Sequence, residues 1–209
     1  MIYIIMCGCA PDEEQPKHFT VIDGEELIAR TIRLLKAEGV EIAISSNNLR
    51  FERFGLPLLM HKNDFYNGSG DWVDGFYPTE EPACYIMGDV FFSPAAIHTI
   101  VKTPTDDVMF FASAPPFGKG YPKPYAEPFA FKVQNQEHFR ASINEVKRLN
   151  ESRKWFRVPI SWELWQVIMN TPRNIIDYNN YTAINDYTCD IDFDNEVNQW
   201  NRGENNEQC

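Results

Sequence analysis

The sequence predicts an α/β domain, because short apolar runs alternate with amphipathic helical segments along most of its 209 residues. Residues 2–6 form a continuous apolar run, which is typical of a strand buried on both faces in a parallel sheet. Residues 25–38 show helical periodicity with their apolar side chains on one stripe, and Gly39 is well placed to cap the C-terminus. Residues 40–45 have the pattern of a second buried strand. Strand, helix and strand in this order predict a βαβ unit.

The rest of the chain continues this alternation and shows no internal repeat or domain boundary. Further strands are predicted at residues 56–60, 83–87, 108–112, 129–133 and 181–184, and helices at residues 71–77, 94–101, 139–148 and 164–169, with a last short helix after residue 192. Pro57 places its strand at an edge or an end of the sheet, because proline cannot donate to a central ladder. Residues 115–128 carry five prolines and are predicted to form a functional loop or a lid. We therefore predict one domain over residues 1–200 and a flexible polar tail over residues 201–209.

Composition and charge narrow the functional class. Thirty acidic and 19 basic residues give a net charge of −11, which argues against a broad surface for DNA, RNA or anionic membranes. The five cysteines are odd in number and mostly lie in or beside apolar runs, which is typical of reduced, buried thiols. No apolar run reaches the length of a membrane span, and the first lacks the basic flank of a signal peptide. A cytoplasmic protein is therefore expected.

A polar loop follows the first strand and could bind phosphate. Gly8 lets the backbone approach a ligand closely, and the amides of such a loop, including that of Cys9, can donate to phosphate oxygens. Lys17 follows Pro16 and could place its ammonium on the same phosphates. By themselves, these features fit a simple turn and a solvated lysine at least as well.

Two further segments place polar groups beside the predicted sheet. Asp89 follows the strand at 83–87 through Gly88, so it lies at the carboxyl edge, where ligands of open α/β sheets bind. A carboxylate there suits Mg²⁺, and a strand-end turn is the alternative. Gly68 and Ser69 precede the helix at 71–77 and could expose amides to a ligand, or could form only a turn and a cap.

The acidic segment near the end of the chain is a second candidate for a metal site. Asp190 and Asp192 alternate along the chain, so their side chains point to the same side and could face one cation. Capping of the following helix by Asp192 or Asp194 is the alternative, and it is favoured for Asp194.

Taken in order, these segments resemble the sugar-phosphate nucleotidyltransferase superfamily, including its cytidylyltransferase-like members. The matching features are Ile4-Ile5-Met6, Gly8, Pro16-Lys17, Phe19, Gly24-Glu25-Glu26-Leu27-Ile28-Ala29-Arg30, Asn67-Gly68-Ser69-Gly70-Asp71-Trp72-Val73, Tyr85-Ile86-Met87-Gly88-Asp89-Val90 and Cys189-Asp190-Ile191-Asp192-Phe193-Asp194-Asn195-Glu196-Val197. The last segment resembles members that make CMP-activated acid sugars. The resemblance implies a three-layer, Rossmann-like single domain with a mixed, mostly parallel sheet, related to glycosyltransferase-A folds.

The resemblance also implies roles for individual residues. It assigns Lys17 and Asp89 to catalysis, Gly8, Cys9, Lys17, Gly68, Ser69 and Gly88 to nucleotide binding, and Asp89, Asp190 and Asp192 to a Mg²⁺ ion. The phosphate loop departs from the family pattern, because it is shorter and lacks the usual second glycine and arginine. The missing cation could come from Lys62, Lys119 or Lys123.

The predicted activity is transfer of a nucleoside monophosphate from a nucleoside triphosphate, with CTP favoured, to a phosphorylated acceptor such as a sugar phosphate, with release of pyrophosphate. The acceptor candidates are Lys119, Tyr121, Lys123 and Glu127, with Tyr125 and Trp162 beside them, whereas Trp165 fits an apolar stripe. Two alternatives stay open. One is a catalytically degenerate nucleotide-binding or regulatory protein, and the other is a glycosyltransferase of related fold that uses the 190–192 segment with a nucleotide sugar.

Overall fold

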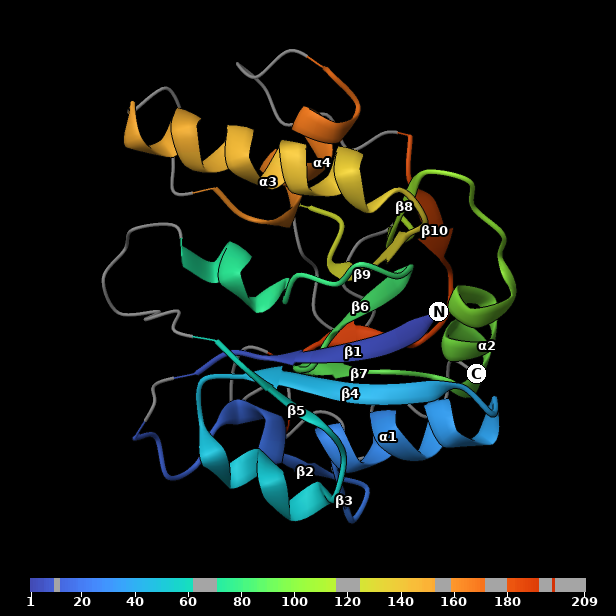
Figure 1. The fold of residues 1–209 in the computed structure, drawn as a ribbon. Helices are drawn as coiled ribbons and strands as arrows, with labels where there is room; N and C mark the ends of the chain where they lie inside the picture. The colour runs from blue at the N-terminus through green and yellow to red at the C-terminus, as the bar shows by residue number, and fades with distance from the viewer. Residues whose placement is uncertain are drawn as a thin grey trace.

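The protein is described by a computed structural model that covers residues 1–9, 12–61, 71–115, 125–152, 159–171, 180–191 and 197. Within these residues, a seven-stranded sheet forms the centre of the molecule, in the order β10-β8-β9-β6-β1-β4-β5 (Figure 1). Its strands are β1 (Ile2–Cys7), β4 (Glu41–Ser46), β5 (Leu58–Met60), β6 (Ala83–Met87), β8 (Val108–Ser113), β9 (Pro128–Val133) and β10 (Thr182–Ile184). The predicted tail, 201–209, lies outside the described residues.

The sheet is mixed and mostly parallel, as predicted. β1 is parallel to both of its neighbours, so that Ile4 pairs with Ala43 of β4 and with Tyr85 of β6. β5 is parallel to β4, and β10 is parallel to β8. The exception is β9, which runs antiparallel to β6 and β8. The carboxyl ends of β1, β4 and β6 therefore meet at one edge of the sheet.

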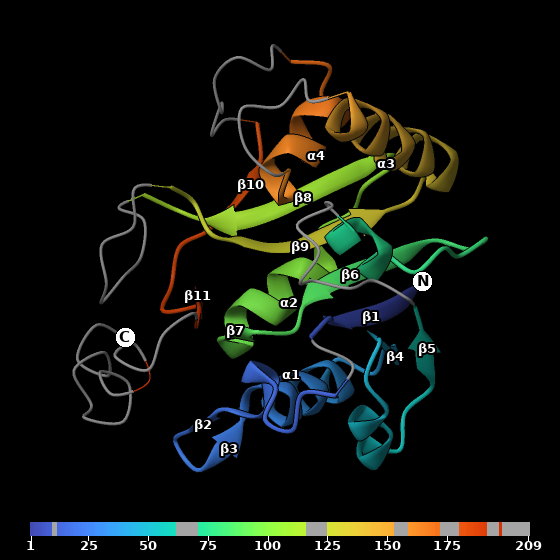
Figure 2. The ribbon, with the colours of Figure 1, turned by 90° about the vertical axis from the view of Figure 1, so that its left-hand side faces the viewer.

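Helices cover both faces of the sheet and make three layers (Figures 1 and 2). On one face, α1 (Leu27–Ala37) and α2 (Pro94–Lys102) bury residues such as Ile32 and Ile97 against Ile5 of β1. On the other face, α3 (Gln136–Glu151) and α4 (Ser161–Ile168) bury Phe139 and Trp162 in a second apolar cluster. No helix of the described residues is both long and apolar enough to span a bilayer.

The first βαβ unit differs from the prediction at the start of its helix. Asp23 and Gly24 have φ values of 52° and 78°, and they form the two-residue turn between β2 (Val21–Ile22) and β3 (Glu25–Glu26). Positive φ at both turn positions matches the twist of a tight hairpin. Glu25 and Glu26 therefore belong to a strand, and α1 begins at Leu27. The predicted cap is confirmed, because Gly39 has φ 70° and its N–H donates to the Lys36 carbonyl at 3.0 Å.

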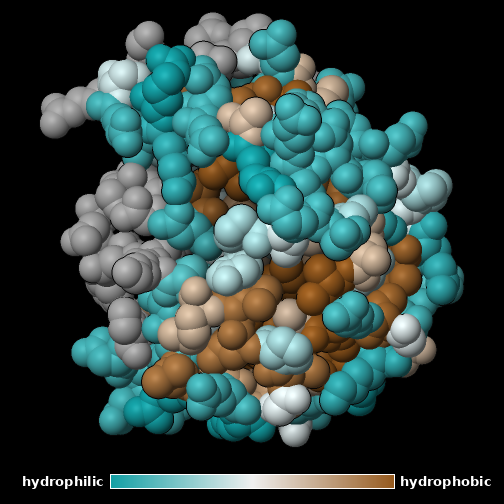
Figure 3. Space-filling view, viewed as in Figure 1, coloured by the Kyte–Doolittle hydropathy of each residue, from teal (hydrophilic) through white to brown (hydrophobic). Residues whose placement is uncertain are grey.

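Pro57 marks a sheet edge, as its position predicted. β5 begins at the next residue and is the outermost strand on its side, while the Pro57 carbonyl accepts from the Ile44 N–H at 2.9 Å. Hydrophobic residues gather over this part of the surface, whereas hydrophilic residues cover α3 (Figure 3). Short 3-10 helices and two-residue strands lie around the carboxyl ends of the central strands and build the candidate site. Of these elements, the sequence predicted only the short helix at 71–77, which is a 3-10 helix over Asp71–Gly75.

Candidate functional site

The site starts where β1 and β6 end side by side. The Gly88 N–H donates to the Met6 carbonyl at 3.0 Å, which carries the pairing of the two strands one residue further. A Cβ atom on Gly88 would lie 2.4 Å from that carbonyl oxygen, 2.8 Å from Cys7 Sγ and 2.9 Å from His18 Cδ2. Only glycine fits such a close approach. Gly88 therefore delivers Asp89 to the carboxyl edge of the sheet, directly beside the end of β1.

Asp89 lies against the residues that follow the polar loop. Lys17 opens the 3-10 helix η1 (Lys17–Phe19), and its ammonium forms an ion pair with the Asp89 carboxylate. Burial alone would raise the pKa of Asp89, but Lys17 and then His18 outweigh it, so that the pKa lies below its usual value. Asp89 is therefore ionised at neutral pH. The Lys17 side chain keeps 45% exposure and the Asp89 side chain 22%, so a ligand can reach both charged groups.

His18 is the neutral neighbour of this ion pair. It is 2% exposed and packs edge-on against Phe51, with ring centroids 5.5 Å apart. Burial lowers the pKa of His18 to about 4, with Asp89 opposing and Lys17 assisting the shift. The ring is therefore uncharged at pH 7, and its Nδ1 has no hydrogen-bond partner among the described residues.

Asp190 joins Asp89 through a short strand pair that the sequence did not predict. β7 (Val90–Phe91) pairs antiparallel with β11 (Cys189–Asp190), so that Asp190 lies opposite Val90. The Ile191 N–H also donates to the Asp89 carbonyl at 3.2 Å. The pairing brings the two aspartates predicted to share a metal to the same end of the sheet, although they are far apart in the chain.

Glu127 lies behind Asp190 and is 1% exposed. Its Oε2 accepts a hydrogen bond from the Asp190 N–H at 3.3 Å, and its own N–H donates to Ser113 Oγ at 2.8 Å. The sequence suggested Glu127 as an acceptor-binding residue. The structure places its carboxylate against the backbone of β11, where it can position Asp190.

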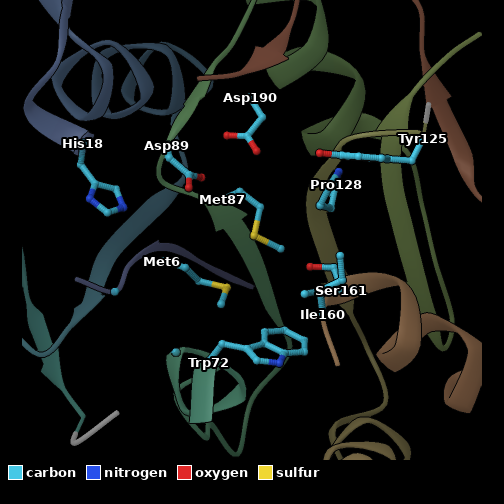
Figure 4. A pocket seen from close by; sticks show the side chains of 12 residues that line it. Met6, His18, Trp72, Met87, Asp89, Tyr125, Pro128, Ile160, Ser161 and Asp190 are labelled. Atoms are coloured by element: carbon cyan, nitrogen blue, oxygen red, sulfur yellow. The ribbon is translucent and has the colours of Figure 1, made fainter. Parts of the chain in front are cut away.

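Asp89, His18 and Asp190 line a cavity of about 310 Å³ (Figure 4). Asp89 and Asp190 lie at one end, and the indole of Trp72, from the 3-10 helix η4 (Asp71–Gly75), lies at the other. The remaining lining residues are Met6, Gly8, His18, Gly75, Met87, Tyr125, Pro128, Ile160 and Ser161. Trp72 and Ile160 were not among the predicted site residues, because an aromatic or apolar side chain in a short segment carries no periodic signal.

The loop predicted to bind phosphate is tied to the end of β4. The Cys9 N–H donates to Asn47 Oδ1 at 3.2 Å, and the Asn48 side-chain amide donates to the Glu13 carbonyl at 3.0 Å. Burial raises the pKa of the Cys9 thiol to about 11. Gly8 lines the cavity, whereas the Cys9 amide donates to Asn47. Two asparagines directly after a buried strand, at the carboxyl edge, were the signal that could have identified this anchor.

Several predicted site residues lie outside the described residues, namely Gly68, Ser69, Lys119, Tyr121, Lys123 and Asp192, together with Lys62. Within the described part of the chain, no three His, Cys, Asp or Glu residues come together as a metal-binding group. Asp89 and Asp190 are thus the two carboxylates of the site on which a metal assignment depends.

No protein-family model and no curated protein sequence matches the chain. Solved structures match it over nearly its whole length. A nucleoside-diphosphate-sugar pyrophosphorylase from Vibrio cholerae has a TM-score of 0.61 at 13% identity, and the match covers 97% of this chain and 100% of that chain. An inositol-1-phosphate CTP transferase from T. maritima has a TM-score of 0.53 at 14% identity, over 97% and 96% of the two chains. A CTP:phosphocholine cytidylyltransferase from Streptococcus pneumoniae has a TM-score of 0.53 at 13% identity, over 96% and 97%. The chain therefore has the mixed-sheet, Rossmann-like α/β fold of sugar-phosphate nucleotidyltransferases and cytidylyltransferases.

Proposed function

We propose that the protein transfers a nucleoside monophosphate from a nucleoside triphosphate to a phosphorylated acceptor. An oxygen of the acceptor phosphate bonds to the α-phosphorus, the bond from that phosphorus to the bridging oxygen of the β-phosphate breaks, and pyrophosphate leaves with the electron pair. The observation that carries the proposal is the meeting of Lys17, Asp89 and Asp190 from three separate segments at the carboxyl edge of the sheet. Such a reaction requires positioning and charge neutralisation, with little covalent chemistry from the protein.

The two carboxylates fit a Mg²⁺ ion, which is usually held by one or two carboxylates together with water and substrate phosphates. Asp89 and Asp190 would hold it, and Asp192 stays a predicted third ligand. A Mg²⁺ ion held there would supply charge neutralisation for the phosphates. Lys17 would hold the triphosphate and stabilise the charge that develops in the transition state. Gly8, Gly68 and Ser69 stay predicted contacts of the nucleotide.

CTP is the nucleotide that we favour, because the segment around Asp190 resembles cytidylyltransferases that make CMP-activated acid sugars. The fold alone does not select the nucleotide or the acceptor. The names of the three similar structures give a nucleoside-diphosphate sugar, inositol 1-phosphate and phosphocholine as their ligands.

The proposal is tested by measuring pyrophosphate release with each of the four nucleoside triphosphates, Mg²⁺ and a panel of phosphorylated acceptors. We expect Asp89→Asn to lower kcat by about 100-fold or more, because it removes a charge that balances the transition state. Asp106→Asn is the matched control. Asp106 is exposed in the turn before β8, at the opposite edge of the sheet, and its substitution should leave kcat unchanged. Near wild-type turnover by Asp89→Asn would overturn the assignment.

The same assay separates the alternatives. Calorimetric binding of a triphosphate without turnover on any acceptor would indicate a nucleotide-binding or regulatory protein. Turnover of a nucleotide sugar without pyrophosphate would indicate a glycosyltransferase.

A further inference from the structure

Away from the two aspartates, the cavity is lined mainly by apolar and aromatic side chains. Met6, Met87 and Trp72 lie along it away from Asp89 and Asp190, and Ile160 lies at its side (Figure 4). Among the described lining residues, none is a lysine or an arginine. The described lining is therefore mainly aromatic and apolar, with two carboxylates at one end.

Two aromatic rings bound this cavity from different elements. Trp72 is half-buried and makes an edge contact with Phe76, at 5.6 Å between ring centroids and an angle of 71°, which packs one side of the indole against the core. Tyr125 lies toward the other end, on the side of Asp190 and beside Pro128 at the start of β9 (Figure 4). Aromatic faces attract a cation whose charge is spread over methyl or methylene groups, and this attraction strengthens where water is excluded.

A polyhydroxylated acceptor would fit the same lining poorly. Each hydroxyl that leaves water needs a hydrogen-bond partner, and an unpaired one costs free energy. Besides the aspartates, the described side chains of the cavity offer the hydroxyls of Ser161 and Tyr125 as such partners. The volume of about 310 Å³ lies at the lower end of the range of roughly 300–1,000 Å³ for small-molecule sites, which suits a compact group.

From these observations we propose that the acceptor is the phosphate ester of an amino alcohol whose ammonium is alkylated, and that Trp72 binds this ammonium. The inference rests on the proposed nucleotidyl transfer and specifies its substrate class. The phosphate of the acceptor lies toward Lys17 and the carboxylates, where it attacks the α-phosphorus as described above. The ammonium lies toward Trp72.

The test uses the wild-type protein with the preferred nucleotide and three acceptors, and it measures kcat/KM from pyrophosphate release. The acceptors are phosphocholine, its uncharged carbon isostere 3,3-dimethylbutyl phosphate, and glucose 1-phosphate. We expect phosphocholine to exceed the isostere by roughly 5- to 30-fold, the ratio that a desolvated cation–π contact supplies. Equal use of the isostere, or a preference for glucose 1-phosphate, would overturn the inference and leave nucleotidyl transfer intact. Absence of pyrophosphate with every acceptor would instead contradict the proposed function.

Variants of Trp72 assign the effect to its ring. Trp72→Phe keeps an aromatic face and should retain most of the preference for phosphocholine over the isostere, whereas Trp72→Leu should reduce that ratio by about 5-fold or more. Trp165→Phe is the matched control, because Trp165 packs against Phe110 in the core and does not line the cavity. A ratio that Trp72→Leu leaves unchanged would refute the role of this ring. If Trp72→Leu does not fold, the isostere ratio of the wild-type protein decides the question.

Discussion

Gly88→Ala is expected to destabilise the protein strongly, because the position has no room for a methyl group. The added Cβ would lie 2.4 Å from the Met6 carbonyl oxygen, which is fixed backbone, and under 3.0 Å from Cys7 and His18. Relief of these contacts has to separate the ends of β1 and β6 and weaken the bond from the Gly88 N–H to Met6. Overpacking of this kind costs about 1–3 kcal/mol, and a lost hydrogen bond about 1 kcal/mol more.

We therefore expect a loss of about 3 kcal/mol in the free energy of unfolding, which corresponds to a fall in Tm of roughly 6–12 °C for a chain of this length. Thermal unfolding followed by circular dichroism measures it. Gly75→Ala is the matched control, since its Cβ would meet the end of the Met6 side chain at 3.1 Å, and that flexible end can move aside. Its Tm should stay within about 2 °C of the wild type. Equal melting of the two variants would refute the reasoning that glycine is required by the approach of β1.

Three further predictions concern the surroundings of the site. Glu127→Leu removes the carboxylate that accepts from the Asp190 N–H, so we expect the Mn²⁺ affinity, measured by electron paramagnetic resonance, to fall about 10-fold. Glu127→Gln keeps an acceptor oxygen and should retain most of the affinity. Equal affinities in both variants would contradict a positioning role. The pKa of His18 is lowered from 6.5 to about 4 in the folded state, so the stability that its neutral form contributes is complete above pH 6.5 and is lost as the pH falls to 4. Urea unfolding should show a loss of up to about 3 kcal/mol from this group, and a pH dependence unchanged in His18→Gln would contradict it. In a Cys209→Ser background, the four buried thiols should resist Ellman's reagent at pH 8 and react fully in guanidinium. The reason is burial, which for example raises the pKa of the Cys9 thiol to about 11. Rapid labelling of one thiol in the native protein would contradict this.

The sequence predicted the parts of the fold in which hydrophobic pattern decides structure. The apolar runs that became β1, β4, β6 and β8 are buried on both faces, so their type and their parallel arrangement followed from composition and from the helices between them. The antiparallel direction of β9 is not visible in its own composition, because Pro128–Val133 is as apolar as the parallel strands β1 and β6. The sequence signal for it is the connection before β9, which has no helical pattern, since parallel neighbours usually need a helical crossover.

The position of a site residue was predictable where that residue directly follows a strand, and less so where tertiary packing determines its position. Asp89 was located from its position after the strand at Ala83–Met87 alone. The approach of Asp190 depends on two-residue strands, which are too short to leave a pattern in the sequence. The inward direction of Glu127 and the contribution of Trp72 depend on tertiary contacts, and the segments around Gly68 and Lys119 lie outside the described residues.

The pairing of β7 with β11 has a consequence for the order in which the protein matures during synthesis. Every strand of the central sheet precedes Asp190 in the chain, so a nascent polypeptide can complete the sheet while one carboxylate of the site is still missing. Until β11 docks, the Lys17–Asp89 ion pair can form without the second aspartate beside it. Completion of the central sheet and assembly of the candidate site are thus separable steps, and the second requires the acidic segment that follows the last strand of that sheet.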